Sequence, residues 1–563
     1  MNNVPIASKM DDKLRKRGNQ KDSSMEESLN NTSESVPGGE KEDTSKRTAR
    51  NGSSSEELEY LEVKHVVLIL LFVFALFFTG TYMFFNAINS TNSFNRENQL
   101  GNKENHFVPS DKPFSEKFSD GKTATKGNQR QSGENLETND PKELDLPTIL
   151  WWTDMLYPHM LSGRGEKKIE CDIGTCYSTN DKSYLPASNT RGIMFYGTDF
   201  RAYEAPLPRQ KWHEWALLHE ESPMNNYILS HAPMLRLFNH TGTYGRESHF
   251  PITTHSLPSL EYLTERQPVP LAAKNSLRRG GSLAPIVYVQ SHCNVASDRD
   301  SYVQELMKYV DIDSYGECLN NKKLPQHLRD PVQSMFSPEF YDSVSKYKFH
   351  LAFENAICDD YVTEKFFRPF HLGSVPIHMG SPSARDWAPD NHSMINTDDF
   401  GSPKELAEFI IRLDNDDAEY EKYLDFKKSG VQNRLLIETM KNRNWAVNEW
   451  GRHSFITAFE CHVCDKIFER WTAERRQARD PSVELPPART GEYKHLGCPV
   501  PFVSVGKLED RELEDDIRVW IQDYWSMYDQ ALALQKMILE GHSDTTKLFD
   551  VLHEMYIESG RMS

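Results

Sequence analysis

The sequence predicts an α/β fold built on a doubly wound parallel sheet, and two observations lead to this prediction. Between residues 280 and 415, apolar segments of strand length alternate with segments of helical periodicity. Within this region, apolar side chains recur at every second position, as in a β-strand, at Tyr347, Phe349, Leu351 and Phe353. Alternating strands and helices of this kind form a parallel sheet that is covered by helices on both faces.

The periodicity also places the individual elements in order along the chain. Strands are expected at residues 148–152, 192–196, 285–290, 347–353 and 374–378. Helices are expected at residues 298–310, 363–372, 403–413, 513–521 and 528–556. The expected strands are short apolar runs, whereas the expected helices carry their apolar residues three or four positions apart. The folded body therefore begins near Pro147.

A membrane-spanning helix is expected before the folded body. Residues 66–85 carry no charge, and at 1.5 Å per residue they cover about the 30 Å of a bilayer core. We predict a signal-anchor helix at 65–86, a disordered cytosolic tail at 1–64 and a disordered lumenal stem at 87–145. A weak excess of Lys and Arg in the tail favours a type II orientation. The basic tripeptide 15–17 is similar to an endoplasmic-reticulum retrieval signal, or is a solvated charge cluster.

The composition excludes several classes of protein. Among 563 residues, 83 Asp and Glu outnumber 65 Lys and Arg, which gives a formal net charge of −18, and 26% of the residues are charged. Such a chain is not a polytopic membrane protein, a collagen or a coiled-coil fibre. Because nucleic-acid binding depends on basic surface, the acidic balance also argues against a nucleic-acid partner.

Two loops occupy the ligand-binding end of the predicted sheet. Residues 290–294 follow one strand and residues 354–360 follow another. Ligands bind at the carboxyl ends of the strands in sheets of this type. Neither loop has the glycine pattern of a dinucleotide site or a P-loop, so a dehydrogenase or a P-loop kinase is disfavoured.

All eight cysteines lie in the folded body, which agrees with an oxidising lumen on that side of the membrane. We expect two short-loop disulfides, Cys171–Cys176 and Cys461–Cys464, and leave the other four cysteines unassigned. A zinc site is not expected, because a lone C-x-x-C would need a second pair of ligands. Lumenal glycosylation sequons occur at Asn89, Asn239 and Asn391.

Three segments resemble the signature of the GDP-fucose-dependent α1,3-fucosyltransferase family: YKFHLAFEN at 347–355, YVTEK at 361–365 and GSVPI at 373–377. Further segments look like one subgroup of it, the GDP-fucose protein O-fucosyltransferases 3 and 4, at 195–201, 215–223, 291–293, 313–316 and 520–525. The resemblance extends from about residue 146 to the C-terminus.

The resemblance implies the GT-B architecture, in which two Rossmann-like domains face each other across a cleft. We therefore expect an acceptor-side domain at 146–280, a GDP-fucose-binding domain at 281–475 and a partly helical extension at 476–563. Inversion at the anomeric carbon is also implied. No cofactor and no obligatory metal are implied, since GDP-fucose is itself the donor substrate.

Inverting transfer needs a base that takes the proton of the acceptor hydroxyl. The segment 219–223 offers two adjacent carboxylates in a loop that ends in proline. Members of the family have a matching Glu-Ser-Pro, which maps the base to Glu221, with Glu220 as the fallback. The alternative is an acidic pair at a helix end without a catalytic role.

The departing diphosphate needs cations and a helix N-terminus beside it. Lys365 lies in the first turn of the expected helix, and Arg299 matches the family's phosphate-contacting arginine, where a bidentate guanidinium would neutralise growing charge. The alternative for either residue is a surface salt bridge. The resemblance implies that Glu364 and Tyr361 also line the donor site. Glu354 and Asn355 follow a strand end, where they can bind guanine or ribose by hydrogen bonds or cap the strand end instead.

These expectations define the function as follows. The chain is expected to be a type II membrane fucosyltransferase of the endoplasmic reticulum that modifies Ser or Thr in EMI-type modules of secreted proteins. The first alternative is a Golgi α1,3-fucosyltransferase that acts on GlcNAc of N-glycans. The second alternative, from another class, is an inactive membrane-tethered binding or chaperone-like protein. The expected partners are GDP-fucose and a folded secretory-pathway protein or glycoprotein.

Overall fold

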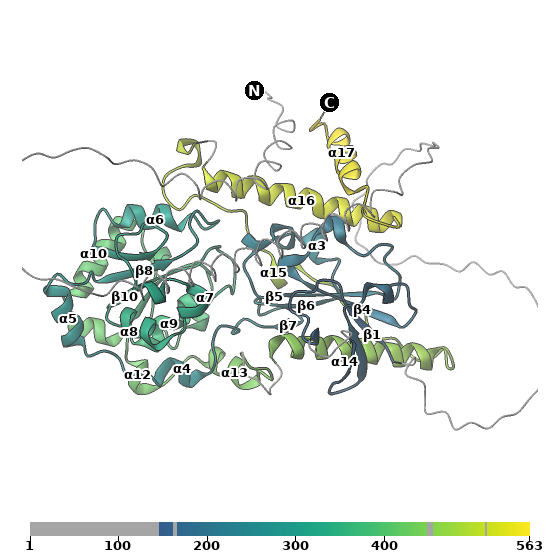
Figure 1. The fold of residues 1–563 in the computed structure, drawn as a ribbon, viewed down its shortest axis with the longest axis horizontal. Coiled ribbons are helices and arrows are strands. Elements are labelled where there is room, and N and C mark those ends of the chain that lie inside the picture. The colour runs from purple at the N-terminus through teal and green to yellow at the C-terminus, as the bar shows by residue number, and fades with distance from the viewer. Residues whose placement is uncertain (1–145, 161–165, 448–453, 513–514, 563) are drawn as a thin grey trace, which may run out of the picture. The chain divides into compact units, whose positions relative to one another are not determined.

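The structure, a computed structural model, describes residues 146–160, 166–447, 454–512 and 515–562 (Figure 1). The predicted tail, the predicted membrane helix at 65–86, the predicted stem, the tripeptide 15–17 and Asn89 lie outside the described residues. Within the described residues, every helix is too short or too polar to cross a bilayer.

The first sheet has seven strands in the order β2-β3-β1-β4-β5-β6-β7. All of its pairs are parallel except the β2–β3 hairpin. The strands are β1 Thr148–Trp151, β2 Glu166–Glu170, β3 Thr175–Thr179, β4 Thr190–Tyr196, β5 Glu214–His219, β6 His240–Thr243 and β7 Phe250–Pro251. The two strands expected here, at 148–152 and 192–196, correspond to β1 and β4.

Alternate side chains of β1, β4 and β5 enter two different cores on the two faces of the first sheet. One face packs against α3 Ala232–Leu235, α15 Tyr493–Leu496, α16 Asp516–Glu540 and α17 Leu548–Glu558. The other face packs against the long helix α14 Phe455–Gln477, which lies alongside this sheet in Figure 1. Helices therefore cover both faces of the first sheet. This is the doubly wound arrangement that the sequence predicts for the second sheet.

The second sheet has five parallel strands in the order β12-β11-β10-β8-β9. They are β8 Ile286–Gln290, β9 Ile312–Gly316, β10 Phe349–Phe353, β11 Val375–Met379 and β12 Ile395–Asn396. Its helices are α4 Leu260–Thr264, α5 Leu271–Arg279, α6 Arg299–Leu306, α7 Pro331–Ser334, α8 Pro338–Val344, α9 Glu364–Leu372, α10 Pro403–Asp414, α11 Asp417–Lys422, α12 Phe426–Ser429 and α13 Arg434–Asn442. The predicted parallel α/β alternation between 285 and 413 is confirmed.

The chain passes between the two sheets at different points from those we expected. Residues 257–280 belong with the second sheet, because Lys274 on α5 donates to the carbonyls of Tyr347 and Gly373. Helix α14 lies almost entirely within the segment 281–475 but packs on the first sheet. The expected boundaries at 280 and 475 therefore do not match the packing, since the apolar pattern of a helix does not say which sheet it covers.

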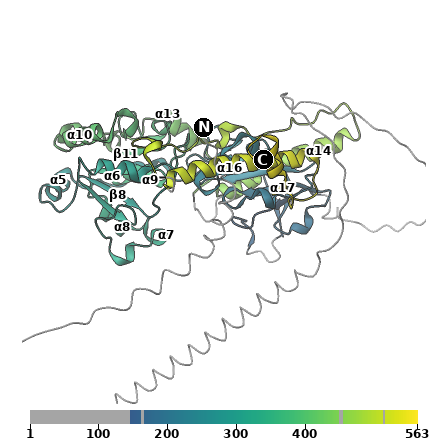
Figure 2. The same ribbon diagram turned by 90° about the horizontal axis from the view of Figure 1, so that it is seen from above.

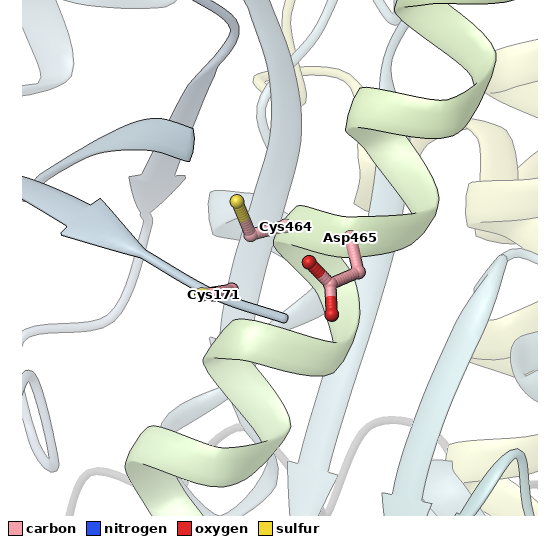
Figure 3. A group of neighbouring side chains, drawn as sticks. All are labelled: Cys171, Cys464 and Asp465. Atoms are coloured by element: carbon pink, nitrogen blue, oxygen red, sulfur yellow. The ribbon is translucent and has the colours of Figure 1, made fainter. Parts of the chain in front are cut away.

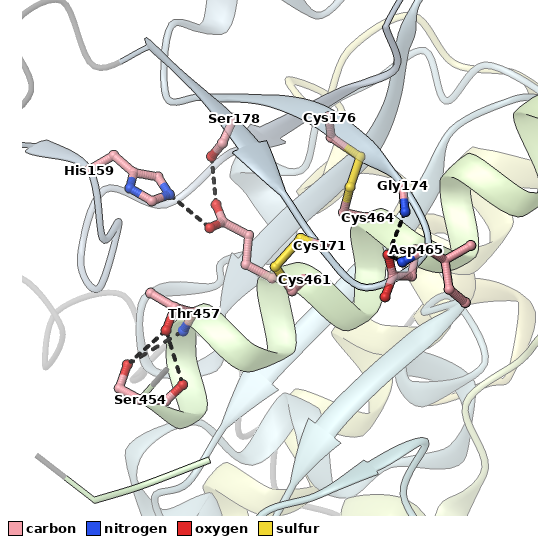
Figure 4. Close-up of a disulfide and its surroundings, with 12 residues drawn as sticks. His159, Cys171, Gly174, Cys176, Ser178, Ser454, Thr457, Cys461, Cys464 and Asp465 are labelled. Atoms are coloured by element: carbon pink, nitrogen blue, oxygen red, sulfur yellow. Dashed lines mark hydrogen bonds and ion pairs between the residues drawn. A yellow bond between two sulfur atoms is a disulfide. The ribbon is translucent and has the colours of Figure 1, made fainter. Parts of the chain in front are cut away.

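The disulfides show why α14 belongs to the first sheet (Figure 4). Cys461 and Cys464 are one turn apart on α14 and pair with Cys171 and Cys176 of the β2–β3 hairpin. The two short-loop pairings that we expected are therefore wrong. Residues three positions apart lie on the same face of a helix, so both cysteines of α14 face the hairpin. The short spacing of the cysteines in the sequence does not reveal these partners.

One apparent group of metal ligands lies at these bridges. Cys171, Cys464 and Asp465 come close together (Figure 3). Both sulfurs are already bonded in disulfides, and Asp465 Oδ1 accepts hydrogen bonds from the backbone N–H groups of Ile173 and Gly174 at 2.9 and 3.0 Å. These disulfides and hydrogen bonds link α14 to the β2–β3 hairpin.

The C-terminal extension is more continuous than the sequence indicates. The helices expected at 513–521 and 528–556 correspond to one long helix, α16, and a shorter one, α17, that packs against it (Figures 1 and 2). The break near 522–527 is wrong because the aromatic residues there continue the buried face of α16. Tyr524 packs on Tyr227 and His231, while Trp520 donates to the carbonyl of Asn294 at 2.8 Å.

Candidate functional site

The two sheets contribute one loop each to a shared group of charged side chains. Strand β5 ends at His219, and the loop after it carries Glu220 and Glu221 before Pro223 begins a short 3-10 turn. Strand β10 ends at Phe353, and the loop 354–363 after it leads into helix α9. Both loops follow the carboxyl end of a parallel strand, which is where such sheets bind ligands.

Glu221 and the first turn of α9 are close enough for their charges to act on one another. Burial raises the pKa of Glu221 above its usual value, the positive charge of Lys365 opposes this, and the negative charge of Glu364 adds to it. A carboxylate in this position, with a pKa displaced toward neutrality, suits a general base. The predicted base thus lies opposite the predicted donor-site helix.

Glu220 has different surroundings from its neighbour. Its Oε1 accepts a hydrogen bond from Tyr196 at 3.1 Å, whereas its Oε2 is buried without a hydrogen-bond partner. Burial raises the pKa of Glu220 to about 7. Its bond to the end of β4 makes Glu220 part of the loop's support, while Glu221 is the carboxylate that interacts with Lys365. This difference favours Glu221 as the base.

Thr363 and Glu354 fix the start of α9. Thr363 is the N-cap residue, and its backbone N–H and its hydroxyl both donate to Oε1 of Glu354, at 2.8 and 2.9 Å. The Glu354 side chain is fully buried, and burial raises its pKa, opposed by the charge of Lys365. Glu354 therefore holds the N-cap residue of α9, the predicted donor-site helix, and a direct contact of Glu354 with the donor stays a prediction.

Lys365 keeps more exposure than the two neighbouring cations, Arg299 and Arg368. Its Nζ lies 3.1 Å from Glu364 Oε1 and 3.7 Å from Glu354 Oε2, and its side chain keeps 22% exposure. Against the effect of burial, Glu364 and Glu354 raise the pKa of Lys365. Burial also acts on Glu364, but the charges of Lys365 and Arg368 hold its pKa at about 2. The first turn of α9 thus presents fixed charges of both signs.

Arg299 differs from our expectation. Its side chain is 1% exposed, and its Nη1 and Nη2 donate to the backbone carbonyls of Phe353 and His292, both at 2.8 Å. The guanidinium that we expected at a phosphate therefore donates to one carbonyl at the end of β10 and one in the loop after β8, because buried carbonyls need donors. Its buried Nε has no hydrogen-bond partner, and its charge lowers the pKa of Lys365.

Asn355 and Tyr361 belong to the loop between β10 and α9. The carbonyl of Asn355 accepts a hydrogen bond from the N–H of Ser297, while its side-chain Oδ1 is buried without a partner. Tyr361 is 2% exposed and packs on Tyr244 with ring centres 5.1 Å apart. Burial and the charges of Glu354, Glu221 and Glu364 raise the pKa of Tyr361, which places its hydroxyl among the carboxylates.

Several further residues hold or line this site, and the predictions from the sequence did not include them. Arg246, after β6, donates from Nε to both oxygens of Asp360 at 2.9 Å, so it fixes the loop after β10 to the first sheet. Cys358 of the same loop is bonded to Cys498. Arg368 follows Glu364 by one helical turn, with its Nε buried and unpartnered, and this spacing was the one available signal.

Replacing Arg246 by Ala should destabilise the protein by about 2 kcal/mol, because it leaves the buried carboxylate of Asp360 without its charged partner. Denaturant unfolding of the variant would measure this loss. The matched control is Arg385→Ala, whose partner Asp399 is half exposed, as Arg385 is. This control should change stability by less than about 1 kcal/mol. Equal effects of the two substitutions would contradict the role of Arg246.

The described glycosylation sequons differ in their surroundings. Asn391 is exposed. Asn239 instead donates from Nδ2 to the carbonyl of Arg489 at 3.0 Å and accepts from Arg209 and from the backbone of Trp215. A glycan on that nitrogen would break these bonds, so we expect glycopeptide mass spectrometry of the secreted body to find Asn391 modified and Asn239 bare. A glycan on Asn239 in folded protein would contradict this.

The comparisons with known proteins identify the family. Residues 144–254 match a family model described as "Fucosyltransferase, N-terminal", and residues 283–480 match "Glycosyltransferase family 10 (fucosyltransferase) C-term". GDP-fucose protein O-fucosyltransferase 3 of Homo sapiens is 45% identical over 412 residues, which cover 72% of this chain and 83% of that protein. The Gallus gallus protein of the same name is 43% identical over 418 residues, covering 73% and 84%.

A solved structure described as "Crystal Structure of alpha1,3-Fucosyltransferase with GDP-fucose" aligns with 59% of this chain and 94% of its own length, at 17% identity and a TM-score of 0.33. At that score the superposition adds nothing to the fold, which is defined here by the order and direction of the strands.

Proposed function

Because this chain belongs to glycosyltransferase family 10, the fucosyltransferases, we propose that it transfers L-fucose from GDP-fucose to a protein acceptor. The relatives that carry the name GDP-fucose protein O-fucosyltransferase 3 support the donor and the class of acceptor. The family that the segments 347–355, 361–365 and 373–377 resemble is thereby confirmed. The observation that carries the proposal is the carboxylate of Glu221 beside the Lys365 charge of α9.

The proposed reaction is a single displacement with inversion. Glu221 takes the proton of the acceptor hydroxyl, and the hydroxyl oxygen forms a bond to the anomeric carbon of fucose. The bond from that carbon to the β-phosphate oxygen breaks, and the electron pair leaves with GDP. Lys365 and the positive end of the α9 helix dipole stabilise the charge that grows on the diphosphate. No metal or cofactor has a role in this scheme.

The finer assignments are also proposals. The acceptor is Ser or Thr in a folded EMI-type module of a secreted protein, and the enzyme works in the endoplasmic reticulum, anchored by the predicted helix at 65–86. Four disulfides within the described residues support an oxidising compartment. The tripeptide 15–17 supports retrieval to the endoplasmic reticulum, and a Golgi location is the alternative.

Parallel incubations with two acceptors test the proposed function. The purified full-length chain is given GDP-fucose with either a folded EMI module or a free N-glycan, and the products are weighed by mass spectrometry. We expect one added fucose on the module. Transfer to the free glycan alone would replace the proposal by the α1,3-fucosyltransferase alternative. Binding of GDP-fucose without transfer to either acceptor would support the inactive binding protein.

A further inference from the structure

A cavity opens at the carboxyl ends of β1 and β4, on the same edge of the first sheet as the base. It encloses about 590 Å³, part of which is open to solvent, between the loops that follow the two strands. The lining side chains that matter here are Trp152, Asp154, Lys182, Asp199, Arg201 and Glu204. None of these residues has a role in the proposed chemistry.

The cavity is connected to the base loop through β4. Thr153, in the cavity wall, accepts a hydrogen bond from the N–H of Tyr196 at 2.7 Å, and the Tyr196 hydroxyl bonds to Glu220 at 3.1 Å. In the sheet, β4 lies between β1 and β5. Two strand spacings are about 10 Å, which an extended polypeptide covers in about three residues. An acceptor whose hydroxyl reaches Glu221 can therefore place a nearby residue in this cavity.

The charged groups of the cavity are not equivalent. The Arg201 guanidinium donates to the carbonyls of Thr198 and Phe200, both at 2.8 Å, and Lys182 lies over the Trp152 ring at 4.9 Å. Both cations are thus engaged locally. The carboxylates of Asp199 and Glu204 have no ion pair or hydrogen bond with other described side chains. The cavity consequently offers two free carboxylates to a ligand.

The apolar part of the lining fits the same kind of ligand. The indole of Trp152 is held by its Nε1 bond to the carbonyl of Glu204 at 2.7 Å, and Met155 beside it is 52% exposed. A long aliphatic chain that ends in a positive charge can cover this surface while its head meets the carboxylates. Lysine and arginine are the two side chains with that build.

We propose that this cavity is an acceptor subsite that binds a Lys or Arg side chain of the acceptor polypeptide, about three residues from the modified Ser or Thr. The inference rests on the proposed function and adds a sequence requirement to it. The subsite acts on acceptor binding alone, because Asp199 and Glu204 do not touch the donor-side loop.

The test is a charge exchange between enzyme and acceptor. The probe is a folded EMI module that the full-length chain modifies, together with a variant of it in which Lys and Arg within four residues of the modified position are replaced by Glu. The double variant Asp199→Lys/Glu204→Lys should raise the KM for the original module by tenfold or more. It should restore a low KM for the Glu-bearing module. The KM for GDP-fucose and the slow hydrolysis of GDP-fucose without acceptor should stay unchanged.

A matched control carries the same change of charge elsewhere. Glu170→Lys/Glu438→Lys replaces two exposed carboxylates outside the cavity and should leave the KM for both modules as in the unmodified chain. An unchanged module KM in Asp199→Lys/Glu204→Lys would overturn the subsite, as would an equal rise for both modules. In either case transfer to the module would still stand. Transfer by the unmodified chain to a free N-glycan alone would overturn the proposed function first and the subsite with it.

Discussion

Replacing Glu221 by Gln should lower kcat by about 10²- to 10⁴-fold, which is the usual contribution of a general base. The amide keeps the shape of the side chain but cannot take the acceptor proton. Affinity for GDP should change little, because Glu221 lies on the loop after β5, whereas the donor-side loop follows β10. Steady-state kinetics and calorimetric titration with GDP measure the two quantities separately.

The neighbouring residue supplies the control. Glu220→Gln changes the same functional group one position away, where the side chain bonds to Tyr196 and Oε2 is buried without a partner. We expect a smaller loss of kcat from this variant than from Glu221→Gln. A larger loss in Glu220→Gln would move the role of base to Glu220.

The pH dependence of the rate follows from the same carboxylate. The base works only when it is deprotonated, and burial raises the pKa of Glu221 above its usual value. Activity should therefore fall as the pH drops through this raised pKa, at a higher pH than for an ordinary glutamate. The pH–rate profile of the residual activity of Glu221→Gln should lack this decrease at low pH. That result would assign the decrease to Glu221.

Replacing Lys365 by Ala should weaken GDP binding by about 10- to 100-fold, since a charge-assisted hydrogen bond contributes about 1.5–3 kcal/mol. Lys365 is the partly exposed cation at the start of α9, and the Arg299 fork is already occupied by carbonyls. Calorimetric titration with GDP measures the change directly.

Two further variants separate binding from folding. Lys365→Arg keeps the charge beside buried Glu354 and should retain most of the stability while it alters the contact with the diphosphate. Lys404→Ala removes an exposed cation of α10 and should leave GDP affinity unchanged. Full GDP affinity in folded Lys365→Ala would contradict the assignment of Lys365 to the diphosphate.

The second sheet could be predicted from the sequence because its strands are buried on both faces. Such strands form apolar runs, and their helices carry clear apolar stripes, so β8, β10, β11, α6, α9 and α10 lie close to the expected positions. The loops that follow β8 and β10 then point to the ligand end without further information.

The packing of separate segments could not be predicted in this way. Cys461 and Cys464 look like a short bridge in the sequence, yet each pairs with a residue nearly 300 positions earlier, at separations of 290 and 288. Arg299 has the expected place in the loop, but the sequence does not show that two buried carbonyls take its guanidinium. Glu220 and Glu221 could be told apart only through Tyr196 and Lys365.

The central claim is that Glu221 activates the acceptor hydroxyl for attack on GDP-fucose. The most direct test is the intact mass of a folded EMI module after incubation with GDP-fucose and either the unmodified chain or Glu221→Gln. We predict one added fucose with the unmodified chain, and almost none over the same time with a variant that still binds GDP. Fucosylation at the full rate by Glu221→Gln would contradict the claim.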